Sequence, residues 1–329
     1  MELLNFNVAI PAGPYFTKYA YLIYHIIKKR IGKINEPAII IPFIEREYLL
    51  FTFIGDKKRE IEKWIKDVLR EGITENEVNI DSINSEIIEQ RQIPSNYITD
   101  KIFTKFFSST YSRPIFKEIK EFDVLEVNRV FEKAIKNSLI LHKNISNNEI
   151  NIKGKNFFKN VKKKILKGTG IKKMKSPFPS GYIGFGFLMP PGFNNLVQSH
   201  ILSAYYDLVF KRELMYKGEI LYLAVSNVSY HFFGYLTTIS LSGFEKNNKE
   251  VMDKTLNIIQ SKPDIPIEYV KNRAIGKILM IMEYKQLWGK WYMDSIIFQY
   301  NIDKLIEGIK KVKTIPHPSL EEIFGILLR

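Results

Sequence analysis

The sequence contains no cysteine, few histidines and no long uninterrupted apolar run among its 329 residues. The absence of cysteine excludes disulfides, thiolate metal sites and cysteine nucleophiles. No apolar run reaches the roughly 18 residues that a membrane-spanning helix needs. The opening segment, MELLNFNVAIPAG, lacks the basic and long apolar regions of a secretory signal. These absences predict a soluble, cytoplasmic protein.

Common catalytic and cofactor motifs are also missing. No two histidines lie three or four residues apart, so no helix presents a pair of histidines to zinc on one face. The segment GYIGFGF runs into Leu-Met-Pro-Pro instead of opening a helix, which excludes a dinucleotide-binding turn. We expect its glycines to ease close strand packing. The five histidines are His25, His142, His200, His231 and His317.

Charge is present in excess and is unevenly placed. The formal net charge is +14, and the segment from Lys153 to Lys175 holds ten lysines and no acidic residue, so the rest of the chain carries only +4. A basic run that includes Phe157 and Phe158 is one pattern of a nucleic-acid-binding module. Charge runs are more often solvated connectors. Both interpretations stay open from charge alone.

The two halves of the chain repeat one order of elements. NVAIPAG, a strand ending in a Pro-Ala-Gly corner, precedes an apolar helical pattern, and GFGFLMPPG precedes another. Later, EYLLFTFIG and FGYLTTISLSG are β-rich runs closed by Gly55 and Gly243, each followed by a charged amphipathic helix. Such self-similarity indicates an internal duplication.

The sequence therefore predicts an α+β fold with two structurally similar halves, each an antiparallel-rich sheet covered by a layer of helices. The segment Asn137 to Ile145 supplies a late strand of the first half. We place the first half at residues 1–150, a Lys-rich linker at 151–179 and the second half at 180–329. The segment SPFPSG, rich in Pro and Gly, supports the linker.

The second half, with DLVFKRELMYKGEILYLAVSNVSYHFFGYLTTISLSG, resembles the pitrilysin and mitochondrial-processing-peptidase family of inverted zincins. The resemblance covers most of the chain and is strongest from Gly181 to Met280. In that family the first helix of the first half carries HxxEH, whose two histidines bind zinc while the glutamate activates the metal-bound water. The fold that the resemblance implies agrees with the duplicated halves.

Placed on this family pattern, the segment YLIYH occupies the HxxEH position. Tyr21 then replaces the first histidine, Tyr24 replaces the glutamate, and His25 is retained. Glu86, in INSEIIEQ, matches the third zinc ligand of the family. One imidazole and one carboxylate do not make a tight zinc site, and a phenol with a pKa near 10 is a poor substitute ligand. The resemblance implies no catalytic residue and no metal in this chain.

The family also uses an Arg and a Tyr, seven residues apart, to bind the substrate peptide. Tyr222 stands at the Tyr position, whereas Met215 stands at the Arg position, so half of this pair is lost. The family's Gly-Gly and Asn-Ala signature of a peptide-binding edge strand is not visible in EPAIIIPFIEREYLLFTF.

The resemblance thus implies a non-catalytic subunit, without enzymatic activity of its own. It would pair with a homologous HxxEH-bearing subunit that carries the zinc, and the heterodimer would enclose a peptide chamber. One alternative is an atypical self-sufficient zinc peptidase that uses His25 and Glu86. A second is a nucleic-acid-binding module that uses Lys153 to Lys175, and a third is a purely structural role.

Overall fold

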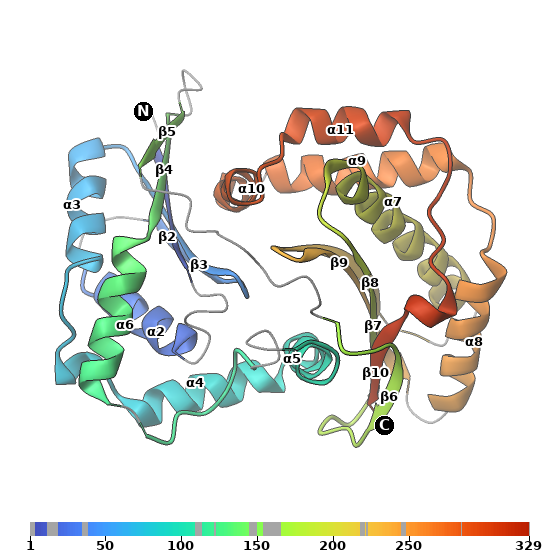
Figure 1. Cartoon of the computed structure of the whole chain (residues 1–329), viewed down its shortest axis with the longest axis horizontal. Coiled ribbons are helices and arrows are strands. Elements are labelled where there is room, and N and C mark those ends of the chain that lie inside the picture. The colour runs from blue at the N-terminus through green and yellow to red at the C-terminus, as the bar shows by residue number, and fades with distance from the viewer. Residues whose placement is uncertain are drawn as a thin grey trace. The chain divides into compact units, whose positions relative to one another are not determined.

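The computed structural model describes residues 4–11, 19–34, 39–108, 114–121, 123–144, 150–153, 166–217, 221, 223–244, 248–283 and 285–328. The chain forms two compact units (Figure 1). The first unit contains residues 1–90, 113–159 and 282–297, and the second contains residues 91–112, 160–281 and 298–329. Each unit therefore includes a segment from the opposite half of the chain.

The sheet of the first unit has five antiparallel strands in the order β2-β3-β1-β4-β5. Leu4 at the start of β1 pairs with Gly55 on one side and with Asn144 on the other. Because it has a neighbour on both sides, β1 lies inside the sheet. The strands are β1 (Leu4–Pro11), β2 (Ile39–Ile44), β3 (Tyr48–Gly55), β4 (Leu139–Asn144) and β5 (Ile150–Lys153).

Helices α2, α3 and α6 cover one face of this sheet (Figure 1). Phe6 and Val8 of β1 point into the apolar core beneath them. α3 buries Ile61, Trp64 and Ile65, the spacing of an amphipathic helix. The helices are α2 (Ala20–Ile31), α3 (Lys58–Val68), α4 (Ile80–Gln92) and α6 (Val124–Lys136), with a 3-10 turn, η1 (Glu75–Glu77), before α4.

The other face is covered by α10 (Lys285–Ile297), which comes from the C-terminal half of the chain. A Cβ atom on Gly289 would lie 1.7 Å from Oδ1 of Asn7 in β1, so only glycine permits this approach. The Tyr48 hydroxyl donates a hydrogen bond to Asp294 Oδ1 at 2.5 Å, and Lys290 Nζ lies 3.0 Å from Asp294 Oδ2. Close packing and buried polar contacts thus hold α10 on the sheet.

The sheet of the second unit has the order β6-β10-β7-β9-β8. β6 and β10 are parallel, and the other neighbours are antiparallel. β7 is bordered by β10 and β9, so it lies inside the sheet as β1 does in the first unit. The strands are β6 (Gly170–Met174), β7 (Gly181–Met189), β8 (Leu223–His231), β9 (Gly234–Phe244) and β10 (Phe324–Leu328).

One face of this sheet packs on α7, where the Phe187 ring stacks on Tyr206 with centroids 5.5 Å apart. The opposite face packs on α5 (Pro94–Phe106), which comes from the N-terminal half. A Cβ atom on Gly184 would lie 2.0 Å from Ile98 Cγ2, so this glycine admits α5. The remaining elements are α7 (Phe193–Phe210), the π-helix η3 (Lys211–Tyr216), α8 (Asn248–Ser261), α9 (Ile267–Glu283), α11 (Ile302–Lys311) and the 3-10 turn η4 (Leu320–Glu322).

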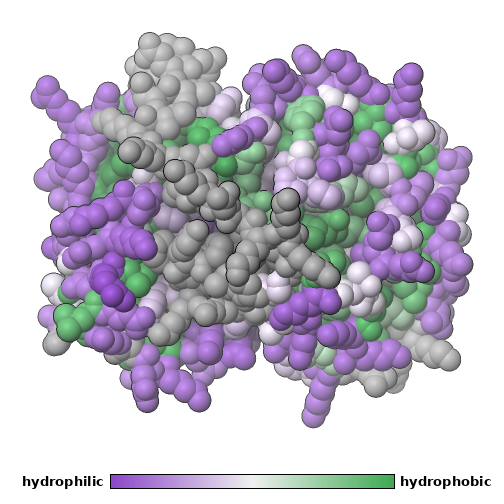
Figure 2. Space-filling model, in the orientation of Figure 1, coloured by the Kyte–Doolittle hydropathy of each residue, from purple (hydrophilic) through white to green (hydrophobic). Residues whose placement is uncertain are grey.

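The predicted α+β class is confirmed: two sheets are covered by helices. The late strand expected at Asn137 to Ile145 is β4. The glycines of GYIGFGF do ease close strand packing, because a Cβ atom on Gly186 would lie 2.8 Å from the Thr237 carbonyl oxygen of the neighbouring β9. In Figure 2, hydrophilic side chains cover the outer surface of α3 and α11, as their amphipathic patterns predict. No helix within the described ranges is long and apolar enough to span a membrane.

The range assigned to the linker contains regular structure. Residues 151–153 belong to β5, and residues 170–174 form β6. Residues 154–165, with Phe157 and Phe158, lie outside the described residues. The boundaries of the two halves stay a prediction.

Candidate functional site

Three residues predicted from the family pattern meet in the first unit, between α2 and α4. Tyr21 and His25 are one helical turn apart on α2, so they lie on the same side of that helix. Both reach Glu86 of α4: the Tyr21 hydroxyl lies 3.3 Å from Glu86 Oε2, and His25 Nδ1 lies 3.4 Å from the same oxygen. The structure thus brings together side chains that are more than 60 positions apart in the sequence.

A fourth side chain, Lys28, completes this cluster. Its Nζ atom lies 3.2 Å from Glu86 Oε1, so the carboxylate has a polar contact on both oxygens. The sequence interpretation missed Lys28, although its position three residues after His25 places it on the same side of α2. That spacing is the signal from which it could have been found.

The surroundings of the cluster are apolar. Tyr21 and His25 are 4% and 6% exposed, and Tyr24 is half-buried. The Tyr24 ring stacks on Phe51 with centroids 5.8 Å apart, and the Tyr21 ring contacts Phe116 edge-on at 5.8 Å. Both tyrosines therefore fill space in the apolar core. A smaller residue would leave a cavity there, and a charged residue would be buried at a cost in free energy.

Burial and the Glu86 charge set the protonation states. Burial is the main cause that raises the pKa of Tyr21 and of Tyr24, so both phenols stay protonated at neutral pH. Burial lowers the pKa of His25, although Glu86 partly opposes this. Burial alone would raise the pKa of Glu86, but the hydrogen bond and charge of Lys28, with His25, hold it below its usual range. The cluster contains a neutral imidazole, one neutral phenol and one ion pair, and the neutral phenol of Tyr24 lies beside it.

These residues do not fit the zinc ion that the resemblance associates with this position. Catalytic zinc takes three protein ligands and a water, and here only His25 and Glu86 have suitable donor atoms. The protonated phenols do not replace the missing ligand, and position 24 has no carboxylate to activate a water. Across the described residues, no group of three or more His, Cys, Asp or Glu side chains could hold a metal ion. The Lys28 ammonium supplies the positive charge beside Glu86.

The predicted peptide-binding positions lie in the second unit. Met215 is half-buried in η3. Tyr222 lies outside the described residues, so its surroundings are not described. Nearby Arg212 donates to Glu213 Oε1 at 2.6 Å and to the Asp264 carbonyl at 3.1 Å. Arg212 therefore has contacts within its own unit.

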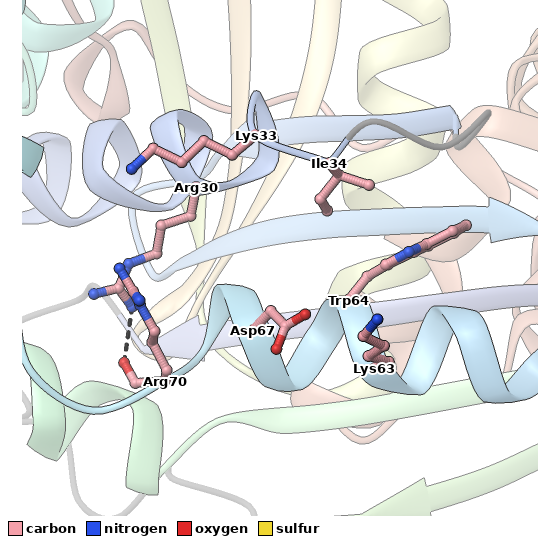
Figure 3. Close-up of a pocket in the computed structure, with 7 residues that line it drawn as sticks. All are labelled: Arg30, Lys33, Ile34, Lys63, Trp64, Asp67 and Arg70. Atoms are coloured by element: carbon pink, nitrogen blue, oxygen red, sulfur yellow. Dashed lines mark hydrogen bonds between the residues drawn. The ribbon is translucent and has the colours of Figure 1, made fainter.

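A basic pocket of about 370 Å³ lies beside α2 and α3, and its lining is drawn in Figure 3. At its inner end Arg30 donates to both carboxylate oxygens of Glu77 and to the carbonyls of Val68, Arg70 and Gly72. These five contacts use all the N–H groups of a guanidinium. Arg30 therefore joins α2 to the chain after α3 and offers no donor to a ligand. The pocket is lined by Arg30, Lys33, Ile34, Lys63, Trp64, Asp67 and Arg70.

The fold matches solved structures of M16 peptidases over the whole chain. The matches include a protease from Helicobacter pylori, with a TM-score of 0.74, 10% identity, and coverage of 100% of this chain and 95% of that one. An inactive M16 peptidase domain from Pseudomonas fluorescens gives a TM-score of 0.72 at 8% identity, covering 99% and 92%. A chain of complex III2 from Candida albicans gives 0.69 at 10% identity, covering 99% and 90%.

No protein-family model and no curated protein sequence matches the chain. The likeness is therefore one of fold, and it agrees with the resemblance inferred from the sequence.

Proposed function

We propose that this chain, which has the fold of M16 peptidases, is a non-catalytic subunit of a peptidase of that kind. It pairs with a homologous HxxEH-bearing subunit, and the two enclose a peptide chamber in which the partner carries the zinc. The observation that carries the proposal is the Tyr21–His25–Glu86–Lys28 cluster, in which a phenol and an ammonium contact the carboxylate that the resemblance assigns to the third zinc ligand. The similarity to an inactive M16 domain supports it.

We also propose that the two halves arose by internal duplication. In support, the sheets have the orders β2-β3-β1-β4-β5 and β8-β9-β7-β10-β6 when the second is read from its other end. In each, the first strand of the half lies inside the sheet and is followed by a helix, then by an antiparallel pair of strands. Chains of this duplicated kind offer two similar surfaces for pairing with a homologue.

Restoring the motif tests whether the cluster corresponds to the zinc site. The double variant Tyr21→His/Tyr24→Glu carries HxxEH at positions 21–25, with Glu86 as the third ligand. If the positions correspond, the variant binds about one zinc per chain, whereas the wild type binds none firmly. Isothermal titration with zinc and metal analysis after gel filtration measure this.

A control separates this site from incidental binding. Adding Glu86→Gln to the double variant removes the third ligand and should weaken zinc binding by at least about tenfold. Equal zinc binding by the double variant with and without Glu86→Gln, or no zinc in a folded double variant, would contradict the assignment of these positions.

Pairing needs a separate measurement. The protein, tagged at its native locus and purified gently, is expected to elute with a stoichiometric partner of the same fold that carries HxxEH and zinc. A native protein that elutes alone as a stable monomer argues against the proposed pairing. Co-elution with nucleic acid instead would favour the alternative in which the segment from Lys153 to Lys175 binds nucleic acid.

A further inference from the structure

Large apolar side chains are exposed along one side of α9 in the second unit. Tyr269 is 68% exposed, Met280 is 54% exposed and Leu279 is 44% exposed. Tyr269, Arg273, Gly276 and Met280 recur at intervals of three or four residues, which places them on one side of the helix. The exposed apolar side chains lie toward the two ends of this side of α9, with Arg273 and Gly276 between them. Exposed apolar residues scattered singly are ordinary, whereas several gathered on one side of a helix are a feature of interaction surfaces.

A hollow of about 510 Å³ lies at one end of this row. Tyr216 of η3, 73% exposed, and Tyr269 of α9 both line it, and Leu208 and Ile265 provide apolar lining. Its volume and its partly apolar lining suit a side chain inserted from another molecule. The full lining is Asp207, Leu208, Lys211, Arg212, Tyr216, Ile265, Pro266, Tyr269 and Arg273.

Gly276 in the middle of α9 has no role in the internal packing. Apart from its chain neighbours and the backbone of α9, no heavy atom of the described residues lies within 4 Å of the position that its Cβ would occupy. A glycine inside a helix costs about 1 kcal/mol relative to alanine. In contrast, Gly184 and Gly289 each admit a neighbouring element of their own unit. The missing side chain at position 276 leaves room for the backbone of an external partner to approach.

The hollow is also bordered by a π-helix, which is a rare element and is frequent at functional sites. Its hydrogen-bonding pattern appears in the Lys217 amide, which donates to the Arg212 carbonyl five residues earlier at 3.0 Å. This turn directs Tyr216 and Arg212 to the lining of the hollow.

Charge determines which partner fits. Lys211, Arg212 and Arg273 line the hollow; Asp207 pairs with Arg273 at 2.7 Å and with Lys211 at 3.0 Å, and Glu213 pairs with Arg212 at 2.6 Å. Three cationic side chains therefore face two acidic ones. The excess is positive, as is the net charge of +14 on the whole chain. A second copy of this chain would be repelled, whereas an acidic partner would be attracted.

We propose that this surface binds an acidic amphipathic helix of a partner protein. We define the α9 face as Tyr216, Tyr269, Arg273, Gly276, Leu279 and Met280. An apolar side chain of the partner enters the hollow beside Tyr216 and Tyr269, its backbone crosses α9 at Gly276, and its carboxylates meet Arg273 and Arg212. The inference does not depend on the zinc-site assignment above, because it uses no residue of the Tyr21–His25–Glu86–Lys28 cluster.

A synthetic peptide tests the proposal on the full chain. The probe is a helical peptide as long as α9, 17 residues, with Leu on one face and Glu on the others, and fluorescence anisotropy measures its binding. Tyr269→Ser should weaken binding at least tenfold, whereas Leu125→Ser, at another exposed apolar position, should change it less than twofold. Arg273→Gln should weaken binding more than Lys310→Gln on α11.

Gly276→Arg separates docking from general attraction. This variant adds positive charge, so binding by charge alone would become tighter, whereas a partner that needs close approach would bind at least tenfold more weakly. Thermal unfolding checks that the variant is folded, and arginine favours the helix over glycine.

Three results would overturn the proposal. One is equal weakening by Arg273→Gln and Lys310→Gln, which would mean attraction to the whole basic chain. Another is no binding of the acidic peptide by the folded wild type. A third is self-association of the wild type that Gly276→Arg abolishes in sedimentation equilibrium, which would make a second copy the occupant.

Discussion

At the scale of single residues, the contacts of Glu86 explain how its partly buried carboxylate is stabilised between α2 and α4. A partly buried carboxylate needs donors or a positive charge. The Tyr21 hydroxyl, His25 Nδ1 and Lys28 Nζ lie 3.2 to 3.4 Å from its oxygens. The sequence predicted that Glu86 belongs beside His25, and the structure places them together. It did not predict Lys28: the spacing after His25 puts this residue on the same side of α2, but only the structure shows that its side chain reaches Glu86.

His200 gives a pH dependence at this scale. It is 8% exposed, its Nε2 lies 2.8 Å from the Tyr230 hydroxyl, and burial lowers its pKa to about 3. Between the unfolded pKa of 6.5 and the folded pKa of about 3, His200 binds a proton in the unfolded chain but stays neutral in the folded chain. The contribution of His200 to stability is therefore complete above that pH and is lost toward pH 3, by up to about 1.4 kcal/mol per pH unit.

We expect His200→Gln to reduce this loss, since Gln does not titrate and can still bond Tyr230. Urea unfolding of both proteins at about pH 7 and about pH 5 measures it, and the fall in unfolding free energy should be smaller in the variant by roughly 1 to 2 kcal/mol. Tyr230→Phe is the control, because it removes the hydrogen bond and keeps the buried imidazole. Identical falls in wild type and His200→Gln would mean that His200 is protonated in the fold.

At the scale of elements, two glycines inside helices have opposite roles. Gly289 of α10 lies against Asn7, where a Cβ would be 1.7 Å from Oδ1, whereas Gly276 of α9 faces open space. Gly289→Ala should destabilise the fold by roughly 2 kcal/mol, because α10 or β1 must shift. Gly276→Ala should stabilise it by about 0.5 to 1 kcal/mol, because alanine favours the helix. Chemical denaturation compares them as a matched pair, and destabilisation by Gly276→Ala would show that the position is packed.

The elements that the sequence interpretation left unassigned are short strands. β6 reads GIKKM, and its two lysines obscure an alternating pattern. β10 reads FGILL, five buried residues that follow a turn and could equally begin a helix. Their pairing partners, β10 with β6 and β7, are distant in the sequence. Only the hydrogen bonds of the assembled sheet make these segments strands.

At the scale of the whole molecule, the two compact units do not coincide with contiguous halves of the chain. The first unit includes α10 from the C-terminal half, and the second includes α5 from the N-terminal half. Each of these helices covers a sheet face at a contact that requires glycine. Neither half by itself contains all the elements of one unit.

This arrangement predicts how fragments behave. Residues 1–150 produced alone lack α10, so one face of the sheet with Asn7 and Tyr48 is uncovered, and we expect no cooperative unfolding transition. Co-expression with residues 151–329 should restore a complex with a single far-UV transition, because the second fragment supplies α10 and receives α5. Cooperative unfolding of isolated 1–150, with the stability of the intact chain, would show that α10 is dispensable.

The sequence by itself determined the α+β class, most helices and strands, and the phenol side chains at positions 21 and 24. Residue periodicity reports local burial, and no tertiary contact can provide a histidine or a glutamate where the chain has tyrosine. The tertiary structure decided that α5 and α10 cover sheets of the opposite halves, that Lys28 meets Glu86, and that α9 presents an apolar face around Gly276. These features depend on which surfaces meet across long sequence separations, and a local pattern specifies that a face is buried but not what covers it.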